Sequence, residues 1–233
     1  MRLILLFGLL AAAAAAEPVK FGSAGRRIHL LELYSSEGCS SCPPAEAWLG
    51  SLRDAPGLWR DFVPVGFHVD YWDRLGWPDR FARREFTARQ YAYADRWGRN
   101  TVYTPGFVLD GAEWRQAGAA PAASGERAGG LAVEYADDGA CRVRYDGAGD
   151  GEVHAALLGA GISSRVRAGE NAGRTLRHDF VVLVLKSAPL TAGAAELSLP
   201  RSTDKNVARQ ALAVWVTRRG ELAPVQAAGG WLD

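Results

Sequence analysis

The sequence predicts an α/β domain followed by a smaller, β-rich domain with the character of a sandwich. Strand and helix patterns alternate from about residue 29 to residue 131, which is typical of α/β domains. After residue 131, short alternating strand patterns separated by turn residues favour an all-β sandwich. The apolar fraction of 48% in 233 residues indicates a large hydrophobic core rather than disorder.

The first 16 residues have the pattern of a cleavable export signal. Arg2 supplies a positive charge, Leu3–Ala16 is an unbroken apolar run, and small residues precede Glu17 as a cleavage site. The run is shorter than the roughly 20 residues that span a bilayer, and an uncleaved anchor is the alternative. We expect cleavage near Ala16 and a periplasmic or secreted mature protein.

The charge of the mature chain argues against nucleic acid or an anionic membrane surface as a partner. The full chain has 27 Lys and Arg residues against 26 Asp and Glu residues, so the loss of Arg2 leaves no net charge. No second apolar run is long enough to span a bilayer, so we expect no membrane span in the mature chain.

In the α/β part, residue types and their spacing define each expected element. Aromatic and β-branched residues indicate the strands. The spacing of Phe86, Tyr93 and Trp97 predicts a helix, and the pair Asp110-Gly111 favours a hairpin turn. The expected elements are strands at His29–Tyr34, Phe62–Val69, Phe107–Leu109 and Ala112–Gln116, helices at Pro44–Arg53 and within Asp79–Trp97, an added loop at residues 70–77, and a weak helix within Ala119–Leu131.

The β-rich part follows an Ala/Gly/Ser-rich stretch at residues 118–130, which is the candidate linker. We therefore place the α/β domain at residues 17–131 and the β-rich domain at residues 132–233. Cys141 alternates with Val143, and this spacing predicts an inward-facing, buried cysteine. The expected strands are Leu131–Tyr135, Cys141–Tyr145, Val153–Leu158, Phe180–Leu185, Glu196–Leu199 and Ala211–Thr217.

The segment with the clearest chemistry is Cys39-Ser40-Ser41-Cys42, between a predicted strand and a predicted helix. Two intervening residues let the sulfurs approach bonding distance at a helix start. Unpaired N–H groups and a partial positive charge there favour a thiolate, the attacking species in thiol–disulfide exchange. We expect Cys39 to attack, and Cys42, one turn inside the helix, to resolve the mixed disulfide.

Other interpretations of the cysteine pair stay open. Pro43 and Pro44 weaken the helix argument, because a helix that begins only there lies farther from Cys39. A structural disulfide is one alternative, although closing so short a loop stabilises little. A zinc site is another alternative, because two thiolates are two of the four ligands of a tetrahedral zinc ion. The third cysteine, Cys141, however belongs to the other predicted domain.

Several segments carry a likeness to known proteins: Glu32–Tyr34, Gly38–Pro44, His68–Asp73, Tyr103–Pro105 and, more weakly, Gly169–Thr175. Together they resemble a bacterial secreted family of thioredoxin-like proteins that is catalogued only as a domain of unknown function. The order of the expected elements is also that of thioredoxin. The resemblance implies a thioredoxin-like α/β domain and brings no established substrate.

The resemblance also implies a cis proline at Pro105 that faces the two cysteines, with an ordinary trans proline as the alternative. Thr104 and Pro105 are then expected to bind the backbone of a substrate in strand fashion. The chain departs from thioredoxin in its Ser-Ser dipeptide and in Leu33, which occupies the position of a buried acid. Glu37 or Glu32 is the alternative acid.

Side chains after the second predicted strand add two further hypotheses. Trp72, with Tyr71 and Trp77, is expected to form a wall beside the cysteines that binds apolar substrate groups, and core packing is the alternative. His68 and Asp70 alternate on one strand face, which fits a metal-binding or proton-relay pair as well as a hydrogen-bonded strand end.

Together these features predict a periplasmic thiol–disulfide oxidoreductase. It is expected to act on the thiols and disulfides of exported proteins, with a redox partner protein and without a bound cofactor or metal. The predicted site consists of Cys39, Cys42, Thr104, Pro105 and Trp72. The alternatives from other classes are a redox-silent binding module and a copper- or zinc-handling protein.

Overall fold

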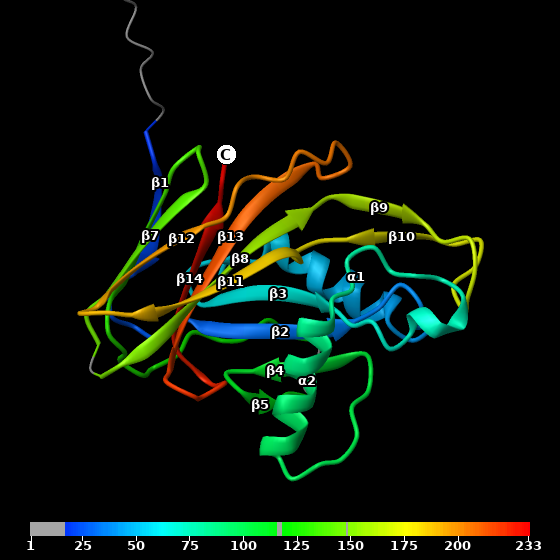
Figure 1. The fold of residues 1–233 in the computed structure, drawn as a ribbon, viewed down its shortest axis with the longest axis horizontal. Helices are drawn as coiled ribbons and strands as arrows, with labels where there is room; N and C mark the ends of the chain where they lie inside the picture. The colour runs from blue at the N-terminus through cyan, green and yellow to red at the C-terminus, as the bar shows by residue number, and fades with distance from the viewer. Residues whose placement is uncertain (1–16, 116–117, 148) are drawn as a thin grey trace, which may run out of the picture.

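The computed structural model describes residues 17–115, 118–147 and 149–233 (Figure 1). The predicted export signal at residues 1–16 lies outside these ranges. Within them the chain is mostly β, with fourteen strands, two α-helices and 3-10 turns at Leu52–Asp54 and Asp73–Leu75. No helix in these ranges is long and apolar enough to cross a membrane.

Eight strands form one mixed sheet. They are β2 (His29–Ser35), β3 (Phe62–His68), β4 (Gly106–Leu109), β5 (Ala112–Glu113), β8 (Gly151–Ala160), β11 (Val181–Leu190), β13 (Arg209–Arg218) and β14 (Pro224–Trp231). Their order is β14-β13-β8-β11-β3-β2-β4-β5. β2 pairs with β3 in parallel, β3 with β11 in parallel, and the remaining neighbours are antiparallel.

A second, antiparallel sheet packs on one half of the large sheet. Its strands are β1 (Val19–Ser23), β6 (Leu131–Tyr135), β7 (Ala140–Tyr145) and β12 (Ala194–Ser198), in the order β1-β6-β7-β12. β9 (Ile162–Arg165) and β10 (Thr175–His178) form a separate hairpin that projects away from the second sheet (Figure 1).

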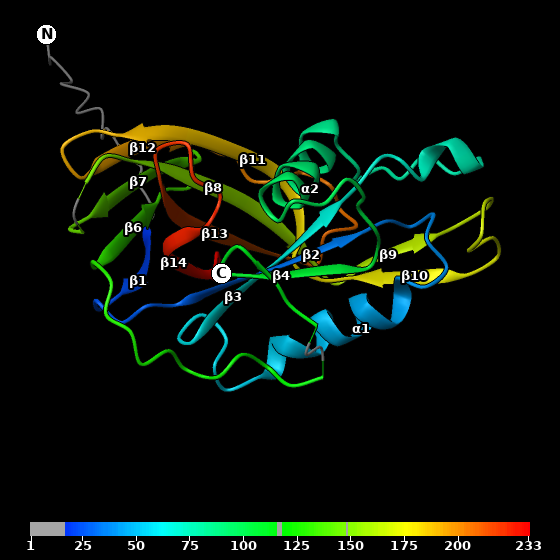
Figure 2. The same ribbon diagram turned by 90° about the horizontal axis from the view of Figure 1, so that it is seen from below.

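The two helices lie on opposite faces of the β2–β3–β4 part of the large sheet (Figure 2). α1 (Pro43–Ser51) follows β2 and buries Leu49. α2 (Arg84–Arg96) precedes β4 and buries Phe86 and Tyr93 on one side, while Arg84, Glu85 and Arg96 are exposed, as an amphipathic pattern predicts.

The central strands bury both of their faces. Leu158 of β8 and Trp215 of β13 belong to a core that also contains the buried residues of both helices. The alternate residues Leu157 and Val214 belong to a second core, beneath the four-stranded sheet. Because side chains alternate across a strand, β8 and β13 supply both cores at once and hold them together.

The predicted fold class, a thioredoxin-like α/β domain followed by a smaller β-rich domain, is wrong. The chain is mostly β, and its large sheet takes strands from both sides of residue 131. The junction is the contact of β3 with β11, where the Gly66 N–H donates to the Phe180 carbonyl at 2.8 Å. The patterns that predicted a separate sandwich belong in part to strands that are covered on both faces.

The local predictions agree better with the structure. The strands predicted at Leu131–Tyr135 and Phe62–Val69 are confirmed to within a residue, and Cys141 is fully buried as expected. The weak helix predicted within Ala119–Leu131 is wrong, because residues 119–130 are irregular and residue 131 begins β6. That stretch is rich in Gly and Ala and has no apolar stripe for a helix to bury. The sequence patterns did not predict four of the strands, namely β1, β9, β10 and β14.

Candidate functional site

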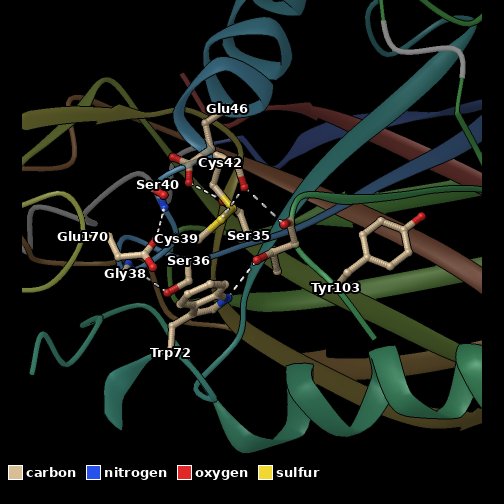
Figure 3. The surroundings of a disulfide bond; sticks show 12 residues. Ser35, Ser36, Gly38, Cys39, Ser40, Cys42, Glu46, Trp72, Tyr103 and Glu170 are labelled. Carbon is tan, nitrogen blue, oxygen red and sulfur yellow. Dashed lines mark hydrogen bonds between the residues drawn. A yellow bond between two sulfur atoms is a disulfide. The ribbon is translucent and has the colours of Figure 1, made fainter. Parts of the chain in front are cut away.

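The two cysteines lie where β2 leads into α1, and they form a disulfide with a Cα–Cα distance of 5.4 Å (Figure 3). Cys42 is the N-cap residue of α1, and Pro43 and Pro44 occupy the first turn, where proline is tolerated. Cys42 therefore lies at the helix start, and the prediction that it lies one turn inside is wrong. The two prolines also remove N–H groups that would otherwise favour a thiolate at Cys39.

The loop between β9 and β10 holds the backbone around the disulfide. Both cysteines are fully buried. The Asn171 side-chain amide donates to the carbonyls of Glu37 and Cys39, each at 2.9 Å. The Glu170 carboxylate accepts the Ser40 N–H at 3.0 Å, an arrangement visible in Figure 3. A segment at least 130 residues along the chain thus fixes the backbone on both sides of Cys39.

Trp72 bounds the site on another side. It packs so closely on Gly38 that a Cβ added there would lie 2.9 Å from the Trp72 Cβ. Its indole N–H donates to the Thr104 hydroxyl at 2.8 Å. Trp72, Glu170 and Asn171 are termed the disulfide cover below, because together they brace the segment that buries the two sulfurs.

The Thr104–Pro105 turn lies beside the disulfide, and its peptide bond is cis. The exposed Ser41 hydroxyl lies 3.3 Å from the Cys39 sulfur and donates to the Thr104 carbonyl at 3.5 Å. Tyr103, which precedes Thr104, is 47% exposed. The structure therefore brings the sequence-predicted residues of the site together, with an exposed rim around a buried disulfide.

Next to the disulfide, five ionisable side chains form a buried ring termed the acid–imidazole cluster. Its members are Glu37, Glu46, His68, Asp79 and His178. His178 bonds Glu37 Oε1 through Nε2 at 3.0 Å and Glu46 Oε2 through Nδ1. His68 bonds Asp79 Oδ2 through Nδ1 at 2.6 Å, and its Nε2 lies 3.9 Å from Glu46 Oε1. The Glu37 N–H donates to Asp79 Oδ2 at 2.8 Å and closes the ring.

The charges of this cluster shift the pKa values of its members. Burial by itself lowers the pKa of His178, but the carboxylates of Glu46 and Glu37 override it and raise that pKa to about 10. Burial by itself raises the pKa of Asp79, but the contact with His68 lowers it to about 2. With both imidazoles protonated, three carboxylates still leave the cluster with one surplus negative charge.

The sequence predicted a role for His68, but the expected partner, Asp70, is wrong. Asp70 accepts a hydrogen bond from the Thr87 hydroxyl at 2.6 Å, and it is Asp79 that pairs with His68. The expected His68–Asp70 pair therefore does not form, because the chain turns away at the end of β3 and α2 supplies a closer donor to Asp70.

The sequence did not predict two other members of the cluster, Glu46 and His178, as site residues. Glu46 carried a usable signal, since it follows Cys42 by four residues and so lies one helical turn beyond it. His178 carried none, because it stands 132 residues from Glu46 and meets it only through the tertiary fold.

The predicted aromatic wall is divided. Trp72 lies beside the disulfide, but the Trp77 indole N–H donates to Glu37 Oε2 at 2.7 Å. The Tyr71 hydroxyl donates to the Gln90 side chain at 3.2 Å. Trp77 therefore supports the acid–imidazole cluster, and Tyr71 is tied to α2.

A second buried polar cluster lies between β2 and α2. The Glu32 carboxylate accepts two hydrogen bonds from Arg89, at 2.8 and 2.9 Å, and one each from the hydroxyls of Tyr34 and Tyr93, at 2.8 and 2.6 Å. We term these residues the Glu32–Arg89 cluster. Glu32 is thus fully engaged and is not free to serve the cysteines.

Comparison with known proteins places the chain in a family. A family model described as "Protein of unknown function (DUF1223)" matches residues 30–217. The chain belongs to this family. The match confirms the expected family of unknown function, whereas the thioredoxin-like assignment finds no support in it. No curated protein matches the sequence.

Two solved structures are similar to this one. A crystal structure of a protein from Agrobacterium tumefaciens has a TM-score of 0.64 and 24% identity, over 90% of this chain and 96% of that one. HBP35 of Porphyromonas gingivalis has a TM-score of 0.56 and 13% identity, over 91% of this chain and 77% of that one. These likenesses concern the fold alone, and the first spans nearly the full length of both chains.

Proposed function

We propose that this DUF1223 protein carries out thiol–disulfide exchange on exported proteins in the periplasm, through Cys39 and Cys42. The observation that supports it most is the position of the disulfide beside an exposed hydroxyl. The Ser41 hydroxyl lies 3.3 Å from the Cys39 sulfur and bonds the Thr104 carbonyl at 3.5 Å. A substrate chain that pairs with the Thr104 backbone would lie beside the Cys39 sulfur.

The stabilisation gained from this disulfide is small, which favours a chemical role. Chain entropy gives about 2 kcal/mol for closing a loop of four residues, less than half of the value for a 100-residue loop. The segment is already fixed by the Asn171 amide and by the turn in which the Cys39 N–H donates to the Ser36 carbonyl. A structural cross-link would therefore add little here.

The exchange needs no component beyond thiols and disulfides. In the reduced protein, the Cys39 thiolate attacks one sulfur of a substrate disulfide, and the other substrate sulfur leaves as a thiolate that takes up a proton. Cys42, as a thiolate, then attacks the Cys39 sulfur and breaks the mixed disulfide, releasing the second substrate thiol. Two electrons pass to the substrate, and a dithiol redox partner returns them by the same steps.

The surroundings of the pair favour the reductant direction. The prolines at the start of α1 remove N–H donors, and the neighbouring acid–imidazole cluster carries surplus negative charge. Both features disfavour thiolates, and a reduced form without thiolate stabilisation belongs to a reducing pair. We expect a potential near the roughly −270 mV of thioredoxin rather than near the −120 mV of DsbA.

Trapping with a defined probe tests the exchange. Cys42→Ala protein, in a Cys141→Ala background, is reduced and then mixed with oxidised glutathione. We expect a stable adduct of one glutathione on Cys39 by mass spectrometry, and none in the Cys39→Ala control. If no adduct forms and the reduction potential of the Cys39–Cys42 pair lies below roughly −300 mV, the disulfide is structural and the proposal is overturned.

The disulfide cover gives a second test. Asn171→Ala removes two hydrogen bonds of about 1 kcal/mol each, and opening should then accelerate disulfide reduction by dithiothreitol about thirtyfold. Asn206→Ala is the matched control, because Asn206 bonds only its neighbour Asp204 in the described structure. An unchanged reduction rate in Asn171→Ala would show that this loop does not gate access to the sulfurs.

A further inference from the structure

Three side chains of the acid–imidazole cluster present donor atoms to one common point. Glu46 offers a carboxylate oxygen, and His68 and His178 each offer one ring nitrogen, and these three atoms all lie within 4.8 Å of one another. The ring nitrogens that face Glu46 are His68 Nε2, 3.9 Å from Oε1, and His178 Nδ1, which bonds Oε2. Zinc binds nitrogen and oxygen at about 2.0–2.2 Å, so two ligands across one ion lie at most about 4.4 Å apart. Small side-chain movements would therefore close this set around an ion.

The second nitrogen of each imidazole is already oriented by a carboxylate. His68 bonds Asp79 through Nδ1 at 2.6 Å, and His178 bonds Glu37 through Nε2 at 3.0 Å. Carboxylate–histidine pairs of this kind fix ring orientation and tautomer in metal sites, and they leave the opposite nitrogen free to ligate. Both histidines therefore have the outer partners of a metal ligand, and both direct the remaining nitrogen toward Glu46.

The charge of the cluster also suits a dication. Three carboxylates face two imidazoles. Trp77 and Ser35 give neutral donors to Glu37 and Glu46, and Asp73 accepts the Asp79 N–H. A divalent ion at this point would bring positive charge into a group of side chains that is rich in carboxylates.

Glu46 also borders a groove at the protein surface. This open groove runs along α1 and β10, and its lining includes Pro43, Glu46, Ala47 and Arg177. Glu46 therefore belongs both to the groove lining and, through its bond to His178, to the cluster.

We infer that Glu46, His68 and His178 form a binding site for a divalent first-row transition-metal ion, with Glu37 and Asp79 orienting the two histidines. Two imidazole nitrogens and one carboxylate oxygen are a donor set that zinc and iron(II) accept, with further positions left for water or another ligand. The inference is independent of the proposed exchange reaction, because no sulfur belongs to the set.

Zinc titration of the full mature chain tests the site. The protein is stripped with a chelator, kept in its oxidised form and carries Cys141→Ala, so that no thiol is free to bind metal. We expect one Zn²⁺ per chain by calorimetry. Co²⁺ should give a visible spectrum of nitrogen and oxygen ligation, without a thiolate charge-transfer band. No one-to-one binding of either ion would overturn the inference.

Variants separate ligands from orienting residues. His68→Ala and His178→Ala should each weaken zinc binding at least 100-fold, and Glu37→Gln should weaken it 10- to 100-fold. His154→Ala is the matched control, because its ring bonds Ser187 and Thr217 outside the cluster, and its affinity should equal that of the parent. Equal affinity in the His68 and His178 variants would overturn the assignment, with circular dichroism confirming that each variant is folded.

Discussion

The Glu32–Arg89 cluster and the acid–imidazole cluster are both buried and both adjoin β2, but their charges are balanced differently. In the first, one carboxylate meets one guanidinium, and two tyrosine hydroxyls occupy further acceptor positions. In the second, three carboxylates share two imidazoles beside a disulfide. The comparison teaches that the first cluster is complete without any other ion, whereas the second has capacity for a cation.

Two buried histidines near these clusters have pKa values that are shifted in opposite directions. His154 stacks on Trp215 with ring centroids 5.3 Å apart, and Arg89 lies over the same Trp215 ring. Burial, reinforced by the charge of Arg89, lowers the pKa of His154 to about 3. The carboxylates around His178 raise its pKa to about 10 against the effect of burial. Burial therefore decides the protonation of His154, whereas the neighbouring carboxylates decide that of His178.

Removal of Arg89 should have the largest effect. Arg89→Met leaves the Glu32 carboxylate buried without its counter-ion, and we expect the free energy of unfolding to fall by about 3–5 kcal/mol in urea titrations. The double variant Glu32→Gln with Arg89→Met removes both charges and should recover much of that loss. If the single variant were as stable as the parent, the cluster would not be the closed ion pair described above.

Glu46→Gln should cost less in the metal-free protein. The amide oxygen can replace only one of the two carboxylate oxygens that bond Ser35 and His178, and the variant removes the surplus negative charge of the cluster. We expect a loss of about 1–3 kcal/mol by chemical denaturation, the value of one buried hydrogen bond to a charged group. A loss equal to that of Arg89→Met would mean that the two clusters are balanced alike.

The pH dependence of His154 sharpens the contrast. Its folded-state pKa of about 3 lies below the value of about 6.5 in the unfolded chain, so the unfolded state binds more protons between these limits. The contribution of neutral His154 to the free energy of unfolding is therefore fully present above about pH 6.5. It is lost as the pH falls toward 3, because the unfolded chain binds the proton first. His154→Gln should remove on the order of 2 kcal/mol of that acid sensitivity. An NMR titration should show the His154 ring neutral, and the His178 ring protonated, at pH 7.

Replacement of the third cysteine should have the smallest effect. Cys141 is fully buried beneath the four-stranded sheet, and burial raises its pKa to about 12. Cys141→Ala should lower stability by about 1 kcal/mol and leave exchange at the other two cysteines unchanged. Loss of glutathione adduct formation in this variant would place redox chemistry outside the candidate site.

The sequence by itself determined the local elements and the chemistry of single residues. Patterns within short windows indicated β2, α1 and β3, the inward position of Cys141, and the cysteine pair at a strand-to-helix junction. These features depend on neighbours in the chain, which is why they could be predicted. The family of unknown function was also recognisable from contiguous motifs.

Only the tertiary structure decided the fold class and the surroundings of the disulfide. β11 lies beside β3 because strand order in a sheet depends on contacts between distant segments, which periodicity does not encode. That same placement carries His178 to Glu46 and Asn171 to Cys39, over more than 130 residues. The acid–imidazole cluster and the disulfide cover therefore arise from long-range pairing, because no local pattern relates residues that meet only when the sheet has formed.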